Sequence, residues 1–291
     1  MEAIEAEELK QPTVKRRFAV YLRRTLPPGA FKVVRAVVLR LRFWWWCLSF
    51  YFPRLVTSRF DKRQPQVRSF GVPQASSHLA KELESLNMLA PTKTCRVMTK
   101  NGSDKGRPNN YTPVYSELFK DRRDQPLRIF ELGLGSDNPD TPSNMGVFGV
   151  PGASHRGWQE LFPRALVFGA DIDRGILFQE GRIKTFYCDQ LDKQSIAELW
   201  SQPDLAGSMD IIIEDGLHTF EGNISFLEGS LDRLRPGGIY VIEDIGWKSI
   251  DKWYARLETV YAKQYPTHEF AFVVLADRGY NNLLVIRRSS N

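Results

Sequence analysis

Acidic and basic side chains follow two apolar runs of the chain at a spacing that suits metal-assisted proton transfer. Asp215 and His218 lie in IIIEDGLH, and Glu243 and Asp244 lie in GGIYVIEDI. In an open α/β sheet, ligands bind outside the carboxyl ends of the strands, so two adjacent strands would direct all four groups into one crevice. Three carboxylates supply the oxygen ligands that a hard divalent cation prefers. A histidine three residues from one of them can accept a proton.

The elements that must position these groups follow from the alternation of apolar patterns after Leu127. Strand-like runs at 127–132, 165–169, 183–188, 209–213 and 239–242 alternate with helical patterns at 156–162, 193–200 and 220–234. This rhythm predicts an α/β fold with a doubly wound, mostly parallel, Rossmann-like sheet. A helix over 251–264 and an antiparallel hairpin of 270–275 with 283–286 are expected to follow. Another helix is expected over 76–89, with a serine cap.

The first strand ends in IFELGLGS, which we assign to a cofactor site. Gly133 and Gly135 would let a ligand approach the backbone closely, and Glu131 and Ser136 flank them. The third glycine of a dinucleotide turn is missing, and no helix opens directly after the turn. This departure favours S-adenosylmethionine over NAD.

Carboxylates after the next two strands support the same ligand. Asp171, in FGADID, could accept hydrogen bonds from both hydroxyls of a ribose, and Asp189, in CDQ beside Gln190, could accept one from an adenine amino group. Each acid could instead cap a helix, since Asp is favoured at such turns. In the order found, they predict an adenosine site.

Several short segments of the sequence resemble those of one protein family. They are SDKGRPNNYTPVYSELF, ELGLGS, GVPGASHRGWQELFP, FGADID, CDQ, IIIEDGLH and GGIYVIEDI. Together they resemble class I S-adenosylmethionine-dependent methyltransferases, specifically the sugar O-methyltransferases of the macrocin and mycinamicin type.

The resemblance implies methyl transfer from S-adenosylmethionine to a hydroxyl of a sugar or a glycolipid-type acceptor. It implies that Asp215, Glu243 and Asp244 hold Mg²⁺ and that His218 is the general base. Mg²⁺ usually takes only one or two protein carboxylates, so one of the three could lie outside the coordination sphere, Glu243 first. Asp104, Lys105 and Tyr111 are candidates for an acceptor site or a lid.

The first sixty residues form a basic extension. Between Lys10 and Arg59 there are twelve Lys or Arg residues and no acidic residue, whereas the whole chain carries a net charge of +6. Around the apolar run Phe43–Phe52, the cations of a helix would lie on one side and the valines, leucines and tryptophans on the other. This pattern suits a helix at a membrane interface. Packing within the protein or on a dimer partner, and binding of nucleic acid, are the alternatives, and no RNA-binding motif accompanies the segment.

The overall organisation is therefore expected to be a basic amphipathic extension at 1–60, a linker and helical lid region at 61–125 with the linker at 61–75, and a methyltransferase domain at 126–291. Three widely spaced cysteines and an acidic N-terminus favour a cytoplasmic protein, peripheral on the membrane if the extension binds there. Oligomeric state is not readable from the sequence.

Three other functions compete. A NAD-binding oxidoreductase would leave the acidic cluster without a purpose. A non-catalytic membrane adaptor would bind lipid but transfer no methyl group. A catechol-type methyltransferase would need an aromatic acceptor pocket.

Overall fold

A single nine-stranded sheet organises the molecule in the computed structural model, which describes residues 14–51, 64–88, 92–106, 109–275 and 281–290. The strand order is β1-β8-β9-β7-β6-β2-β3-β5-β4. The strands span β1 Gln66–Phe70, β2 Arg128–Leu132, β3 Leu166–Asp171, β4 Gln179–Glu180, β5 Ile183–Tyr187, β6 Met209–Glu214, β7 Leu234–Ile245, β8 His268–Val274 and β9 Asn282–Arg288.

The five central strands, β7, β6, β2, β3 and β5, are parallel. The order runs outward from β2 in both directions, which confirms the predicted doubly wound sheet. β9 and β8 form the predicted antiparallel hairpin, and β9 pairs with β7. The carboxyl ends of the parallel strands therefore share one edge, where the predicted site residues lie.

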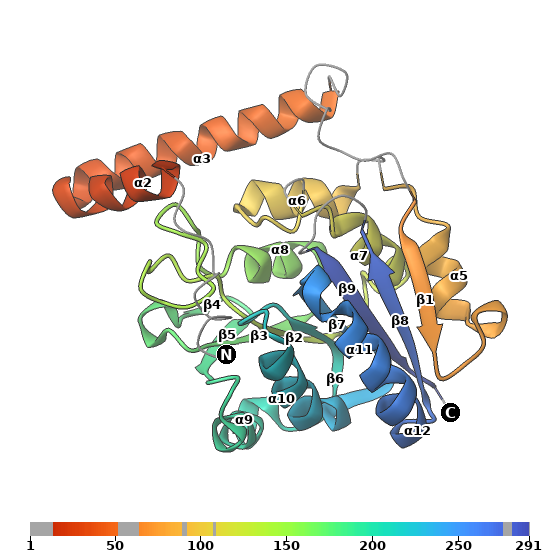
Figure 1. Cartoon of the computed structure of the whole chain (residues 1–291). Coiled ribbons are helices and arrows are strands. Elements are labelled where there is room, and N and C mark those ends of the chain that lie inside the picture. Colours follow the sequence, from red (N-terminus) through yellow and green to blue (C-terminus); the bar gives the residue numbers. More distant parts are fainter. Residues whose placement is uncertain (1–13, 52–63, 89–91, 107–108, 276–280, 291) are drawn as a thin grey trace.

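Helices cover both faces of the sheet (Figure 1). One layer contains α5 (His78–Glu84), α6 (Lys93–Asn101), α7 (Thr112–Leu118) and α8 (Ala153–Leu161), and the other contains α9 (Lys193–Trp200), α10 (Phe220–Ser230), α11 (Ile250–Arg256) and α12 (Ala262–Gln264). Side chains alternate between the layers along each strand. In β2, for example, Ile129 packs in the first core and Phe130 in the second.

Local sequence sets several helix ends. Ser77 caps α5, as predicted, and Thr219 caps α10, in each case by accepting a backbone amide. The predicted helix over 220–234 is shorter, because α10 ends at Ser230 and a 3₁₀ turn, Leu231–Arg233, leads into β7. The predicted helix over 251–264 is α11, a π-helical turn (Leu257–Tyr261) and α12.

Strand β1, helix α6 and the two-residue strand β4 were not predicted. The stretch 61–75, expected to be a linker, contains β1, whose residues pair with β8 from Gln66 opposite Val274 to Phe70 opposite Phe270. α6 begins at Lys93, and its C-cap residue Gly102 lies in the left-handed region at a φ of 91°. Residues 64–125 thus add a strand and a helical layer to the same sheet.

The described part of the basic extension, residues 14–51, is helical, as α2 (Val14–Thr25) and α3 (Pro28–Tyr51); the rest of it lies outside the described residues. α2 folds back beside α3, and α3 extends past the body of the molecule (Figure 1). Within the described ranges, none of the helices combines the length and apolar character needed to cross a bilayer.

Candidate functional site

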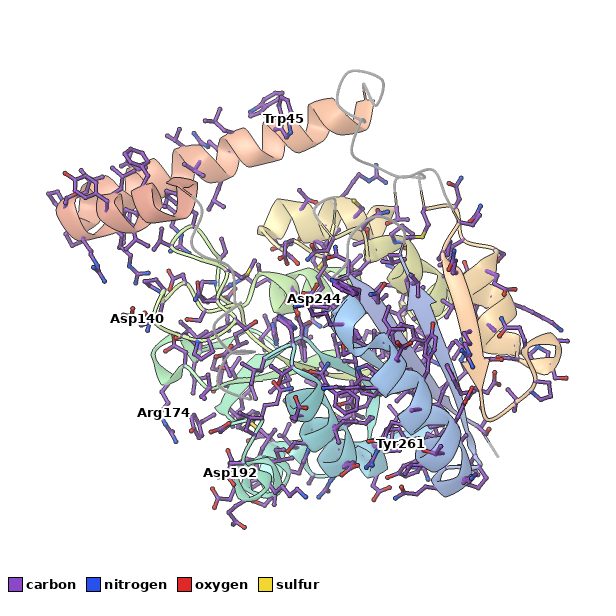
Figure 2. The ribbon with its side chains drawn as sticks, in the orientation of Figure 1. Trp45, Asp140, Arg174, Asp192, Asp244 and Tyr261 are labelled. Carbon is purple, nitrogen blue, oxygen red and sulfur yellow. The ribbon has the colours of Figure 1, made fainter. Side chains whose placement is uncertain are left out.

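Asp215, His218 and Asp244 converge at the carboxyl ends of β6 and β7. The Nε2 atom of His218 lies 3.8 Å from Asp215 Oδ1 and 3.8 Å from Asp244 Oδ2. One ligand atom from each of the three residues falls within 4.8 Å of the others. The two carboxylates of this group, both half-buried, fit a divalent cation that also keeps water ligands, and the half-buried imidazole lies beside them. Figure 2 places Asp244 at this edge of the sheet.

The backbone at this cluster is strained. His218 has a φ of 61° and Asp244 a φ of 53°, two of the four described non-glycine residues with positive φ. Such conformations cost about 1–3 kcal/mol each and persist where surrounding structure enforces them, commonly at functional sites. The Nδ1 atom of His218 is buried without a hydrogen-bond partner in the described part of the chain.

Glu243, predicted as a third metal ligand, points away from this group. It is 1% exposed, and its Oε2 atom accepts a hydrogen bond from Lys105 Nζ at 2.8 Å, while Oε1 accepts one from the Tyr115 hydroxyl. Burial raises the pKa of its carboxyl well above the usual range, although Lys105 acts in the opposite direction. The structure therefore brings Glu243 to the interior side of the acidic cluster.

Glu131, predicted to bind the cofactor, is fully buried on the same interior side. Its carboxylate accepts hydrogen bonds from Ser154 Oγ, at 2.5 Å, and from Trp158 Nε1, and it lies 3.3 Å from Lys105 Nζ. These partners bind both oxygens of Glu131. Its side chain is held within the protein.

The glycine turn links the cofactor region to the candidate metal residues. Gly133 has a φ of 94°, and a Cβ atom there would lie 1.9 Å from the carbonyl oxygen of Asp215. Gly135 has a φ of 75°, and its Cβ would lie 2.4 Å from the sulfur of Met145. The protein's own chain, rather than a ligand alone, therefore requires glycine at both positions.

Asp171 and Ser136 stabilise the loop that follows this turn. Asp171 accepts hydrogen bonds from the backbone amides of Leu134, at 2.8 Å, and Asp173, at 2.9 Å. Ser136 donates to Asp173 at 2.5 Å. Burial raises the pKa of the Asp171 carboxyl, with these backbone hydrogen bonds opposing the shift. Asp171 and Ser136 thus lie side by side at the ends of β2 and β3.

At the end of β5, Asp189 is half-buried and accepts a hydrogen bond from the amide of Leu191 at 2.9 Å. Gln190 is buried, donates to Glu214 at 2.7 Å and accepts from the amide of Leu217 at 2.8 Å. Burial raises the pKa of Glu214 to about 7. Gln190 therefore connects the adenosine side of the predicted site to the turn that carries His218.

The N-terminal helices hold the loop after the glycine turn. Arg23 donates to the carbonyl of Asp137 at 2.5 Å, and Arg35 lies 3.4 Å from the Asp137 carboxylate. Phe31 of α3 stacks on Phe148, with ring centroids 5.9 Å apart. The inner side of the extension is thus packed on the loop that follows the glycine turn.

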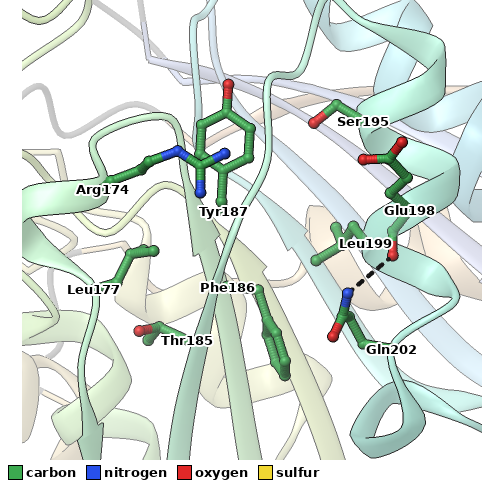
Figure 3. Close-up of a pocket in the computed structure, with 9 residues that line it drawn as sticks. All are labelled: Arg174, Leu177, Thr185, Phe186, Tyr187, Ser195, Glu198, Leu199 and Gln202. Carbon is green, nitrogen blue, oxygen red and sulfur yellow. Dashed lines mark hydrogen bonds between the residues drawn. The ribbon is translucent and has the colours of Figure 1, made fainter.

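A separate pocket of about 360 Å³ lies between β5 and α9 (Figure 3). Its rim includes Arg174, whose guanidinium stacks 3.5 Å from the centre of the Tyr187 ring. None of the predicted site residues lines it. Its lining residues are Arg174, Leu177, Thr185, Phe186, Tyr187, Ser195, Glu198, Leu199 and Gln202.

Sequence reasoning missed the interior half of the acidic cluster. It placed Lys105 and Tyr111 at an acceptor site or lid, whereas Lys105 bonds three carboxylates and Tyr111 donates to Asp244. It did not identify Trp158 as the donor to buried Glu131. The sequence signal was the position of Lys105 and Tyr111 in one block, SDKGRPNNY.

Comparison with known proteins finds relatives that are named O-methyltransferases. The chain is 35% identical over 147 residues to 8-demethyl-8-alpha-L-rhamnosyl tetracenomycin-C 2'-O-methyltransferase of Streptomyces olivaceus, covering 50% of this chain and 36% of that protein. It is 35% identical over 136 residues to demethylmacrocin O-methyltransferase of Streptomyces fradiae, covering 46% and 31%. Over about half of its length, the chain is thus similar in sequence to these O-methyltransferases. It spans about a third of the length of these curated relatives, and no family model matches it.

A solved methyltransferase structure shares the fold of this chain. MycE methyltransferase from the mycinamycin biosynthetic pathway, in complex with Mg and SAH, aligns with a TM-score of 0.51 and 23% identity, covering 74% of this chain and 61% of that one. The class I methyltransferase fold predicted from the sequence is thus confirmed. The oxidoreductase alternative is not favoured, because the curated relatives are methyltransferases.

Proposed function

We propose that the chain is a metal-dependent O-methyltransferase that moves a methyl group from S-adenosylmethionine to a hydroxyl of a sugar. The observation that carries this proposal is the convergence of Asp215, His218 and Asp244 beside the glycine turn of a class I methyltransferase sheet. Homologues named for O-methylation at sugar positions support the acceptor class.

The reaction would exchange one bond for another. The methyl carbon's bond to sulfur breaks as its bond to the acceptor oxygen forms, and the sulfonium leaves as a neutral thioether. His218 receives the hydroxyl proton at Nε2, the ring nitrogen that faces both carboxylates. General-base assistance of this kind typically contributes about 10²–10⁴-fold. A bound divalent ion would lower the pKa of the hydroxyl and orient it.

The carboxylates of Asp215 and Asp244 would hold the ion. Burial raises the pKa of the Asp215 carboxyl, while Lys105 and His218 lower it. A buried carboxylate of this kind gains from a nearby cation. On the opposite side of the turn, the ends of β2, β3 and β5 would receive the adenosine, through Asp171 and Asp189.

Variants of Asp215 and His218 test the proposed metal-binding and general-base roles. We expect Asp215→Ala to abolish methyl transfer while the affinity for S-adenosylmethionine, measured by calorimetry, stays within about threefold of wild type. We expect His218→Asn to lose turnover by about 10²–10⁴-fold but to retain ion binding. A labelled-methyl assay on sugar and glycolipid acceptors gives the turnover. Full activity of the wild type in EDTA would contradict the metal role.

We also infer that α3 rests on an anionic membrane. Val33, Val37, Leu41, Trp44 and Trp45 are 50–66% exposed and lie within an arc of about 120° at 100° per residue. Exposed Lys32 and Arg40 lie on the same helix. Figure 2 shows Trp45 projecting from α3 on the side away from the sheet. An apolar stripe with neighbouring cations suits lipid headgroups.

A second copy of the chain fits this face less well, since the extension carries twelve cations and no acid between residues 10 and 59, and self-association would oppose like charges. If the inference is correct, the acceptor would be a membrane glycolipid or lipid-linked saccharide.

Vesicle sedimentation tests this surface. We expect the wild type to sediment with vesicles containing phosphatidylserine, and the double variant Trp44→Ala/Trp45→Ala to lose most of that binding. Trp247→Ala is the matched control, because Trp247 is 57% exposed outside the extension, and it should bind as the wild type does. Equal binding by all three proteins would refute the membrane surface. Lipid binding by the wild type without any methyl transfer would support the adaptor function instead.

A further inference from the structure

The ammonium group of Lys105 is enclosed by three carboxylates at the ends of three neighbouring strands. Lys105 is 1% exposed, and its Nζ atom lies 2.5 Å from Asp215 Oδ2, 2.8 Å from Glu243 Oε2 and 3.3 Å from Glu131 Oε1. These carboxylates follow or end β6, β7 and β2, which are adjacent in the sheet. An ammonium has three N–H donors and no acceptor, so one donor is available for each carboxylate.

The remaining oxygens of the two interior acids are also bound. Glu131 accepts from Trp158, and Glu243 accepts from the Tyr115 hydroxyl. Of the six carboxylate oxygens around the ammonium, Oδ1 of Asp215 alone receives no hydrogen bond from the residues that the structure describes. The arrangement thus leaves one oxygen of one acid open.

Asp244 is held in the same manner. Its Oδ1 atom accepts the Tyr111 hydroxyl at 2.5 Å, and its Oδ2 atom lies 3.8 Å from His218 Nε2. Lys105 and Tyr111, six residues apart, therefore each fix one oxygen of a candidate ligand and leave the other oxygen facing His218.

The surrounding charges favour a cation at Lys105. Three carboxylates lie within 3.3 Å of its Nζ atom, and removing one partner of a buried ion pair leaves an uncompensated buried charge. An ion that displaced the ammonium would have to compensate for that loss.

We propose that Lys105 is a positioning residue that keeps Glu243 in the interior and turns one oxygen of Asp215 outward. Asp215 and Asp244 then hold the divalent ion, and Glu243 is not a ligand. This inference rests on the proposed function only in requiring that an ion binds beside His218. It narrows the ligand set that the family resemblance implies.

Ion binding by the purified full-length chain, measured without methyl donor or acceptor, tests the ligand set. The probe is Mn²⁺, followed by electron paramagnetic resonance, with Mg²⁺ calorimetry in parallel. We expect Glu243→Gln to bind Mn²⁺ within about twofold of wild type. Asp244→Asn, a matched loss of one charge from the adjacent residue, should weaken binding at least about tenfold.

Changes at Lys105 test the positioning role. We expect Lys105→Met to weaken Mn²⁺ binding by about 10–100-fold, the usual effect of removing a partner that orients a ligand. Tyr115→Phe is the control, because it removes the other hydrogen bond to Glu243 and leaves Asp215 untouched, and it should bind Mn²⁺ as the wild type does. Binding of S-adenosylmethionine establishes that each variant is folded.

Two results would overturn the inference. One is a loss of Mn²⁺ affinity in Glu243→Gln as large as that in Asp244→Asn. The other is tighter Mn²⁺ binding by Lys105→Met, which would mean that the ammonium occupies the ion's own position. If Lys105→Met does not fold, the comparison of Glu243→Gln with Asp244→Asn still decides. A wild-type chain that binds no ion at all would instead contradict the metal role in the proposed function.

Discussion

Gly133 sits where the cofactor turn touches the strand end that carries Asp215, and its replacement by alanine should disturb both. An added Cβ would lie 1.9 Å from the Asp215 carbonyl oxygen, about 1.1 Å inside the closest approach of about 3.0 Å. A non-glycine residue at this positive φ costs about 1–2 kcal/mol. Overpacking of a filled interior costs about 1–3 kcal/mol more. Gly133→Ala should therefore lower stability by about 2–5 kcal/mol.

Gly207 supplies the matched control. Its φ of 92° is almost the same as the 94° of Gly133, but a Cβ there would meet nothing within 4 Å. Gly207→Ala should lose only the backbone contribution, about 1–2 kcal/mol. The two variants then differ by the overpacking cost of about 1–3 kcal/mol. At about 2–4 °C per kcal/mol, thermal scanning should place Gly133→Ala about 2–12 °C below Gly207→Ala.

Ion binding separates the two variants further. Gly133→Ala must displace the backbone at Asp215, so its Mn²⁺ affinity should fall, whereas that of Gly207→Ala should not. The reasoning is refuted if the two variants melt together and bind Mn²⁺ equally well.

Two further predictions concern buried polar groups. Trp158→Phe removes the donor to buried Glu131 and should lower the free energy of unfolding, measured in urea, by about 1–3 kcal/mol. Trp200→Phe removes a donor to the neutral Ser230 hydroxyl and should lower it by less. An equal loss in both variants would contradict the role of the Glu131 charge. Burial, with a smaller contribution from Arg288, lowers the pKa of His268 to about 4. The folded protein therefore disfavours protonated His268, so this stability is complete above pH about 6.5 and is lost as the pH falls through about 4. His268→Gln should flatten that part of the stability profile, and an unchanged slope would exclude His268 as its origin.

The central sheet was predictable from the sequence because each parallel strand is a short apolar run ending in a polar or glycine-rich turn. β6 and β7 are examples, and Asp215 and Asp244 at their carboxyl ends lie close together as expected. β1 was not predictable, because Pro65, Gly71 and Pro73 surround a run of only five residues. Its strand character comes from pairing with β8, about 200 positions later along the chain.

The division of the acidic cluster into an interior and an outward half could not be predicted either. Lys105 and Asp215 are 110 positions apart, and Lys105 and Glu243 are 138 apart. No local pattern encodes such contacts, since they depend on where the fold places Lys105 relative to the ends of β2, β6 and β7. The residue types were visible in the sequence, but the partner of each carboxylate was not.

The pairing of β1 also has a consequence for biosynthesis. Phe70 is synthesised early, and its partner in the sheet is Phe270 of β8. Because 270 − 70 = 200, a further 200 residues must leave the ribosome before that partner is available. Joining such distant segments is entropically costly and slow. Until then the β1 edge is an unpaired strand in a nascent polypeptide, the kind of surface that invites aggregation. Arg68, at the middle of β1, places a charge on that edge until β8 has been synthesised.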